Sequence, residues 1–203
     1  MSGFAKDGDY SALVPLFKDS GLSDDTFNAL GKAAYYENIL NISAATGEVR
    51  RVIQGLDQVR EDHESSLLLP VMKQRFEWLE QQKQFEKQTH LARQALERKD
   101  YLRSILYAYE AVITRLCQQE GVEVEKYDAR ESVRKSYEQG LKDAKAYGGS
   151  DYQLLKNLRN QVAHGTRGGE GKIQKILLSE DVMEQELGRL LGLIEKGKLP
   201  AER

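Results

Sequence analysis

Hydrophobic residues recur every three or four positions along most of the chain, which is the spacing of one face of an α-helix. The clearest segment spans residues 100–120. Its apolar residues are Leu102, Ile105, Leu106, Tyr109, Val112, Ile113 and Leu116. Asp100 is a residue type that caps helix starts, and Gly121 is the type that follows helix ends. The pattern therefore predicts an amphipathic helix that buries one face.

Similar stripes predict helices in the first part of the chain. Ser23 followed by two aspartates is a typical helix start, and Pro70 belongs in a first helical turn or at a kink. The three stripes are Phe27, Leu30 and Ala34; Val49, Val52, Ile53, Leu56 and Val59; and Leu68, Met72, Phe76 and Leu79. The third stripe predicts one longer helix.

The second part of the chain continues the helical pattern. Residues 90–100 predict a helix that forms a hairpin with the next one, and residues 122–127 are expected to be briefly extended. Residues 127–147 predict a helix that the following two glycines end. The last helix opens at Ser179 and buries Met183, Leu187, Leu190, Leu191 and Ile194.

No run of alternating β-branched residues is long enough to form a central strand. The expected fold is therefore all-α. Residues 1–84 are expected to form an N-terminal helical subdomain, and residues 85–203 a compact helical bundle.

Composition narrows the function classes. The chain has 203 residues and a formal net charge of −2, which excludes a globally basic surface for nucleic acid. Its longest unbroken apolar stretch, residues 67–72, is too short to cross a bilayer, and its N-terminus lacks the apolar core of a signal peptide. The single cysteine, Cys117, cannot form an internal disulfide. These features favour a cytoplasmic protein without a membrane partner.

The segment "SDYQLLKNLRNQVAHG", residues 150–165, combines helix signals with an unusual set of polar residues. Ser150 and Gln153 have the spacing of a capping box, and Gly165 stands where a helix would end. Its inner stripe is formed by Leu154, Leu155, Leu158 and Val162.

Arg159 lies on the shoulder of that stripe, while Asn160 and His164, four residues apart, share a face turned mostly away from the core. The small Ala163 leaves room between them. An arginine, an amide and a histidine are less common on a helix face than the usual glutamates and lysines. An ordinary exposed pair, with the histidine favoured by the helix dipole, is the competing interpretation.

The surroundings of this helix are basic. Residues 152–178 contain five lysines or arginines and one acid, a local balance of +4 against −2 for the whole chain. Four of these cations are candidates for contacts with RNA phosphates, although surface solubility also explains them. They are Lys156, Arg167, Lys172 and Lys175.

These residue types suit RNA cleavage by the 2′-hydroxyl. Histidine can transfer protons near neutral pH, and arginine can bind two phosphate oxygens. An amide can hold the histidine or bind phosphate. The reaction needs two proton-transfer groups, and this segment supplies one histidine. Two copies of the segment facing each other across a dimer axis would supply both groups.

The sequence "RNQVAH" resembles the R-x-x-x-x-H signature of HEPN domains, and "YLRSILYAYEAVITRLC" resembles the partner helix of that fold. The resemblance covers roughly residues 85–203. It implies a HEPN-type helical bundle and a dimeric, metal-independent ribonuclease that cuts single-stranded RNA. By this resemblance Arg159 and His164 are catalytic and Asn160 is supportive.

Upstream, "DYSALVPLF", a tyrosine-rich helix and "ISAATGEVRRVI" resemble CRISPR-associated HEPN ribonucleases of type III systems, which act in antiviral defence. In those proteins an N-terminal CARF domain senses cyclic oligoadenylate. No α/β sheet domain of that kind is expected in this chain, so the sensor is expected to be absent. The chain would then be a fragment of a longer protein or a stand-alone relative.

Neither His63 nor His90 has a second histidine at ligand spacing, so no metal site and no cofactor are expected. Two function classes then fit the sequence. One is an endoribonuclease that acts as a homodimer on single-stranded RNA. The other is a non-catalytic helical module in which Arg159 and His164 shape a dimer or partner interface.

Overall fold

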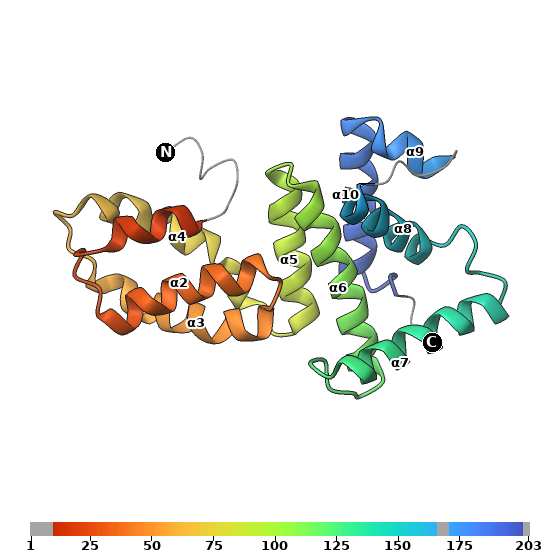
Figure 1. The fold of residues 1–203 in the computed structure, drawn as a ribbon, viewed down its shortest axis with the longest axis horizontal. Coiled ribbons are helices and arrows are strands. Elements are labelled where there is room, and N and C mark those ends of the chain that lie inside the picture. Colours follow the sequence, from red (N-terminus) through yellow and green to blue (C-terminus); the bar gives the residue numbers. More distant parts are fainter. Residues whose placement is uncertain (1–9, 166–170, 201–203) are drawn as a thin grey trace. The chain divides into compact units, whose positions relative to one another are not determined.

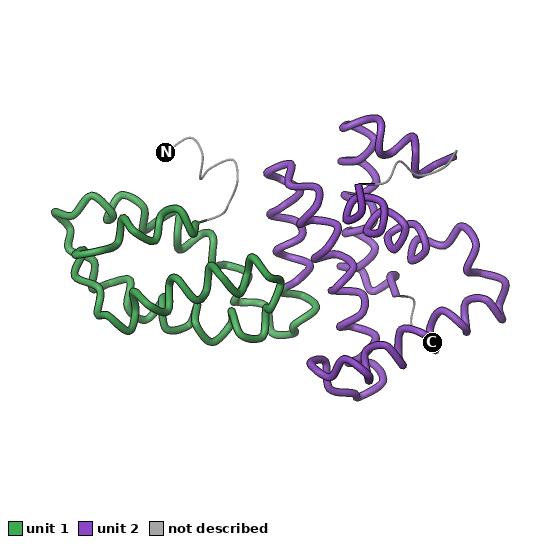
Figure 2. The backbone as a smooth tube through the Cα atoms, viewed as in Figure 1, with its two compact units in different colours: residues 1–87 green, residues 88–203 purple. Residues whose placement is uncertain are grey.

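The computed structural model describes residues 10–165 and 171–200. All regular elements within these ranges are helical, which confirms the all-α class (Figure 1). None of the described helices combines the length and the apolar character that crossing a membrane requires. The chain forms two compact units, Met1–Lys87 and Gln88–Arg203 (Figure 2). The sequence placed this division between residues 84 and 85.

The N-terminal unit is built on two packed helices, α2 (Asp24–Asn38) and α3 (Ile42–Gly55). Ser23 caps α2 as expected, because its hydroxyl accepts a hydrogen bond from the Thr26 amide at 3.2 Å. The side chains that fill the core between and around these helices include Leu30, Ala33, Ala45, Val49 and Val52, all fully buried. Ile53, expected on the inner stripe, is instead exposed.

The longer helix expected from the third stripe is broken. Its residues form the 3₁₀ helix η3 (Glu64–Leu68), α4 (Leu69–Arg75) and the 3₁₀ helix η4 (Glu77–Glu80). Pro70 lies in the first turn of α4, as predicted. In one continuous helix, Phe76 and Trp78 would be rotated by about 200° from each other. The break between α4 and η4 lets both rings be buried.

Gly55 is a point of close helix contact in this unit. A Cβ atom at Gly55 would lie 2.4 Å from the Thr26 Oγ1 atom of α2, whereas a Cβ at Gly47 on the same helix would meet nothing within 4 Å. We expect Gly55→Ala to lower the free energy of unfolding by about 1–3 kcal/mol, because of this overlap. Gly47→Ala is expected to raise it by about 0.5–1 kcal/mol, through helix propensity.

The measurement is urea unfolding followed by the fluorescence of Trp78, the single tryptophan of the chain, which is buried in the same unit. Equal shifts of the two variants in the same direction would contradict the steric argument.

The C-terminal unit contains most of α5 (Gln84–Glu97) and all of the later helices. These are α6 (Tyr101–Gln119), α7 (Tyr127–Asp143), α8 (Asp151–His164), α9 (Lys172–Leu177) and α10 (Glu180–Glu195). Helix α6 packs against α7, α8 and α10 and forms the centre of the unit (Figure 1).

Both ends of α6 match the sequence prediction. The Asp100 side chain accepts a hydrogen bond from the Arg103 amide at 3.0 Å, and Gly121 has a left-handed φ of 67° just past the helix. Helix α10 likewise has Ser179 as its N-cap, and its predicted inner residues are buried.

Helix α7 ends four residues earlier than predicted. Lys145 takes a left-handed φ of 54°. Its amide donates to the Lys142 carbonyl at 2.9 Å, and the Ala146 amide donates to the Leu141 carbonyl at 2.8 Å. This pair of bonds is a Schellman motif, which ends the helix at Asp143 before the glycines are reached. The segment before α7 contains turns and no strand, in contrast to the expected extended segment.

Candidate functional site

Helix α8 carries the motif identified from the sequence. The Ser150 hydroxyl accepts a hydrogen bond from the Gln153 amide at 3.1 Å, so the N-cap is confirmed. The side-chain oxygen of Gln153 accepts a hydrogen bond from the Gly149 amide at 2.9 Å. In a standard capping box the donor is the amide of the N-cap residue itself, which here is Ser150. At the other end Gly165 has a left-handed φ of 61°. The sequence therefore defines the limits of this helix well.

The inner face of α8 packs against α6. Tyr152, Leu155 and Leu158 are buried, whereas Leu154 and Val162 of the predicted stripe are half-buried. Burial of these side chains fixes the rotation of the helix. It leaves Lys156, Arg159 and Asn160 half-buried on one side of α8.

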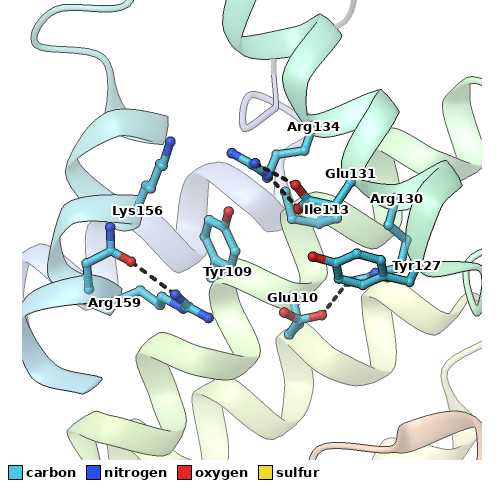
Figure 3. Close-up of a pocket in the computed structure, with 10 residues that line it drawn as sticks. Tyr109, Glu110, Ile113, Tyr127, Arg130, Glu131, Arg134, Lys156 and Arg159 are labelled. Carbon is cyan, nitrogen blue, oxygen red and sulfur yellow. Dashed lines mark hydrogen bonds and ion pairs between the residues drawn. The ribbon is translucent and has the colours of Figure 1, made fainter. Parts of the chain in front are cut away.

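That side of α8 borders a cavity of about 460 Å³ within the C-terminal unit, between α6, α7 and α8 (Figure 3). Each helix contributes residues spaced along one of its faces. The lining consists of Tyr109, Glu110 and Ile113 from α6; Tyr127, Arg130, Glu131 and Arg134 from α7; and Lys156, Arg159 and Asn160 from α8. Four cations and two tyrosines make this a candidate site for an anionic, aromatic ligand.

The two arginines of α7 are held by carboxylates. Arg134 donates to both oxygens of Glu131, at 2.9 and 2.8 Å, and to Glu138 at 2.7 Å. Arg130 forms an ion pair with Glu110. The bonds from Arg134 hold the pKa of the Glu131 carboxyl below its ordinary value. Both arginines therefore face their own counter-charges in the cavity wall.

The buried carboxylate of Glu138 holds Lys156, the third cation of the cavity, in place. One oxygen of Glu138 accepts hydrogen bonds from the Tyr152 hydroxyl, from Lys156 and from Arg134, each at 2.7 Å. Burial acts to raise the pKa of Glu138, but the bonds from Lys156, Tyr152 and Arg134 outweigh it and keep that pKa below its ordinary value. Glu138 thus ties α7 to α8 and fixes the ammonium of Lys156.

Arg159 differs from the other three cations. Its Nη1 atom donates to the Asn160 side-chain oxygen at 3.0 Å, and its guanidinium carbon lies 5.6 Å from the ring centroid of Tyr109 (Figure 3). Both partners are neutral, and Arg159 forms no ion pair within the described part of the chain. It is therefore the cation of the cavity wall best placed to accept an incoming anion.

Charges around the cavity nearly balance. The four cations face three carboxylates, those of Glu110, Glu131 and Glu138, which leaves one positive charge. Since the other three cations are paired, this charge belongs to Arg159.

The structure brings together only part of the predicted site. Lys156, Arg159 and Asn160 line the cavity, whereas His164 is exposed at the last residue of α8 and is not part of the lining. His164 follows Arg159 by five positions in the helix, which corresponds to about 140° of rotation and about 7.5 Å along the axis. One copy of the helix does not present both side chains to the same cavity.

The remaining predicted RNA contacts lie elsewhere. Lys172 on α9 forms an ion pair with Glu186 at 3.1 Å, and Lys175 is exposed. Neither belongs to the cavity lining. Arg167 lies outside the described residues.

The sequence interpretation missed the contribution of α7. Tyr127, Arg130, Glu131 and Arg134 fall at i, i+3, i+4 and i+7, which places them on one helix face. A stripe of aromatic and charged residues at this spacing was the available signal. Its meaning depends on α6 and α8 lying opposite, which the local pattern does not reveal.

Two other features bear on chemistry. Among the described residues, no three His, Cys, Asp or Glu side chains gather in a group suited to a metal ion. Cys117 is fully buried in α6, and burial raises the pKa of its thiol.

Comparisons with models of protein families, with curated proteins and with solved structures gave no significant match to this chain. Its function is therefore to be inferred from helix α8 and the cavity beside it.

Proposed function

We propose that this protein is a metal-independent endoribonuclease that cleaves single-stranded RNA at a site completed by a second copy of the chain. One observation carries the proposal. Arg159 stands in the wall of a cationic cavity without a carboxylate partner in the described part of the chain, on the helix whose last residue is an exposed histidine.

The chemistry required is a transfer within the RNA. The 2′-oxygen bonds to the adjacent phosphorus, the bond from phosphorus to the 5′-oxygen breaks, and a 2′,3′-cyclic phosphate and a 5′-hydroxyl result. One group removes the proton of the 2′-hydroxyl and another protonates the 5′-oxygen. Arg159 would bind the phosphate oxygens and stabilise their added charge, while Asn160 holds its guanidinium.

The position of His164 supports a composite site. Its side chain and that of Ala163 are exposed at the end of α8, turned away from the cavity of their own chain. A two-fold axis near this end would bring two exposed histidines together, one from each subunit, since such an axis uses the same surface of each subunit. Two histidines suffice for both proton transfers.

The resemblance to type III CRISPR-associated HEPN ribonucleases extends the proposal to antiviral defence in the cytoplasm. A second candidate is a non-catalytic interaction module. The pairing of Arg130, Arg134 and Lys156 with glutamates favours it, because such networks also serve only to join helices.

The decisive experiment incubates the purified protein with end-labelled single-stranded RNA in the presence of EDTA, while light scattering measures its mass. We expect cleavage that survives the chelator and rises with protein concentration until the dimer is saturated. Products should carry a cyclic phosphate. Cleavage that EDTA abolishes and magnesium restores, or full activity of a monomer, would contradict the proposal. A dimer without any activity would favour the interaction module.

A further inference from the structure

We infer that the cavity between α6, α7 and α8 binds one nucleotide of an RNA strand, with its phosphodiester on Arg159 and its base against Tyr127, and that Glu110 and Glu131 restrict the site to a single negative charge. The inference rests on the proposed function and deepens it, because it names how each protomer holds the substrate. The cavity lies within one chain, so the subsite does not depend on dimer geometry.

The volume of the cavity and the exposed aromatic ring at its edge suit a nucleotide. A cavity of about 460 Å³ is within the range that holds small molecules. Tyr127, the first residue of α7, lines the cavity with 75% of its surface exposed, whereas Tyr109 is only 8% exposed. Figure 3 shows the Tyr127 ring pointing toward the side of the cavity where Tyr109 and Arg159 lie. An exposed ring at the edge of a cationic cavity is a stacking surface for a base.

Tyr109 has a different role. Its ring lies under the guanidinium of Arg159, with 5.6 Å between the guanidinium carbon and the ring centroid. This cation–π contact, together with the hydrogen bond to Asn160, holds Arg159 without neutralising it. The guanidinium keeps donors for phosphate, and the buried Tyr109 ring is not available to a base.

The net charge of the cavity favours a phosphodiester over a triphosphate. The network leaves one positive charge at the cavity, which matches the single negative charge of a phosphate within an RNA strand. A triphosphate brings a further two or three negative charges, and these would have to displace Glu110 or Glu131 from Arg130 and Arg134. The hydrogen bonds of Arg134 lower the pKa of Glu131, so this carboxylate keeps its charge at neutral pH.

The test is a titration of the ¹⁵N-labelled full chain, followed by NMR, with two uridine ligands. One is a dinucleoside monophosphate whose first sugar is 2′-deoxy, so that it cannot be cleaved. The other is uridine triphosphate without magnesium. We expect the dinucleotide to shift amide signals of α6, α7 and α8 around the cavity, and the triphosphate to bind no more tightly. A triphosphate that binds about tenfold more tightly, or shifts confined to other helices, would overturn the inference.

Two substitutions of Tyr127 distinguish the contribution of its ring from that of its hydroxyl. Tyr127→Ala is expected to weaken dinucleotide binding about fivefold or more, since base stacking is lost. Tyr127→Phe should bind as the parent does. Tyr35→Ala, at another exposed tyrosine in the N-terminal unit, should have no effect. Equal affinities of the Tyr127→Ala variant and the parent would exclude Tyr127 from the site.

Glu131→Gln tests the charge restriction. It frees Arg134 from one carboxylate, so triphosphate affinity is expected to rise about fivefold while dinucleotide affinity changes less. Glu48→Gln is the matched control, because Glu48 pairs with Arg51 at the same spacing, outside the cavity. An unchanged triphosphate affinity in Glu131→Gln would contradict the role of that carboxylate.

The two proposals fail differently. Cleavage of RNA without dinucleotide binding in the cavity would reject the subsite and leave the ribonuclease proposal intact. Binding with the expected variant effects, but without cleavage of any RNA, would reject the ribonuclease and leave the subsite.

Discussion

Arg159→Ala is expected to slow the cleavage of single-stranded RNA by about 100-fold to 1,000-fold, the usual cost of removing one donor that stabilises charge in a transition state. The guanidinium is held by Asn160 and Tyr109 and has no competing carboxylate among the described residues, so its loss leaves the phosphate without its main cation. Arg159→Lys should retain part of the activity, since a lysine keeps the charge and loses the paired donors.

His164→Ala should reduce the same rate by about 100-fold to 10,000-fold, because a proton-transfer group is removed. Initial rates on labelled RNA measure both effects, and far-UV circular dichroism checks that the variants are folded. Lys32→Ala is the control, because Lys32 is exposed on α2 in the N-terminal unit and outside the cavity. An active His164→Ala variant would remove this residue from the catalytic set and, with it, the reason for a composite site.

Glu138→Gln is expected to lower the free energy of unfolding by about 2–3 kcal/mol at pH 7, although the amide keeps nearly the same shape. The change leaves Lys156 facing a neutral group and deprives Arg134 of one of its two carboxylates. Glu123→Gln is the matched control in the same unit. Glu123 pairs with Lys126 at 3.0 Å, but both side chains are about two-thirds exposed, so a loss below about 1 kcal/mol is expected.

The destabilisation should depend on pH in a defined direction. The pKa of Glu138 is lower in the folded protein than its ordinary value of about 4.3. A carboxyl with a lowered pKa stabilises the fold above the unfolded-state pKa and loses this contribution as the pH falls through the folded-state value. The difference between parent and Glu138→Gln should therefore narrow below about pH 4. Urea unfolding at a series of pH values measures it, and a constant difference would show that lost packing, not charge, is responsible.

Much of the helix layout could be predicted because the signals are local. Asp100, Ser150 and Gly165 act at helix ends as their chemistry suggests, since a cap needs only the neighbouring amides or a left-handed backbone. The stripe of α10 identified its buried face correctly, because that helix presents one face to the core. The stripe of α6 was only partly right. Leu102 is exposed, and Ser104, Ala108 and Thr114, which lie outside the stripe, are buried, because α6 has neighbouring helices on several sides.

Other features depend on contacts distant in the sequence. Helix α7 ends at Asp143 because Lys145, just beyond it, takes the left-handed conformation, and lysine is a residue type that carries no stop signal. The break before Trp78 follows from the need to bury two rings that one helix would direct apart. Arg159 and His164 of α8 are separated for a similar reason, because their surroundings come from distant parts of the chain. Arg159 turns into a cavity made by three helices, whereas His164 remains outside it.

The burial of Cys117 has a practical consequence for studies of the C-terminal unit. The thiol lies on α6 with none of its surface exposed, and burial raises its pKa. A thiol reagent can reach it only when the surroundings of α6 open, because the reactive thiolate must form in contact with water. The rate of alkylation therefore measures the local opening equilibrium of this unit. Trp78 provides the corresponding optical signal for the N-terminal unit, so the stability of each half of the chain can be followed in the unmodified protein.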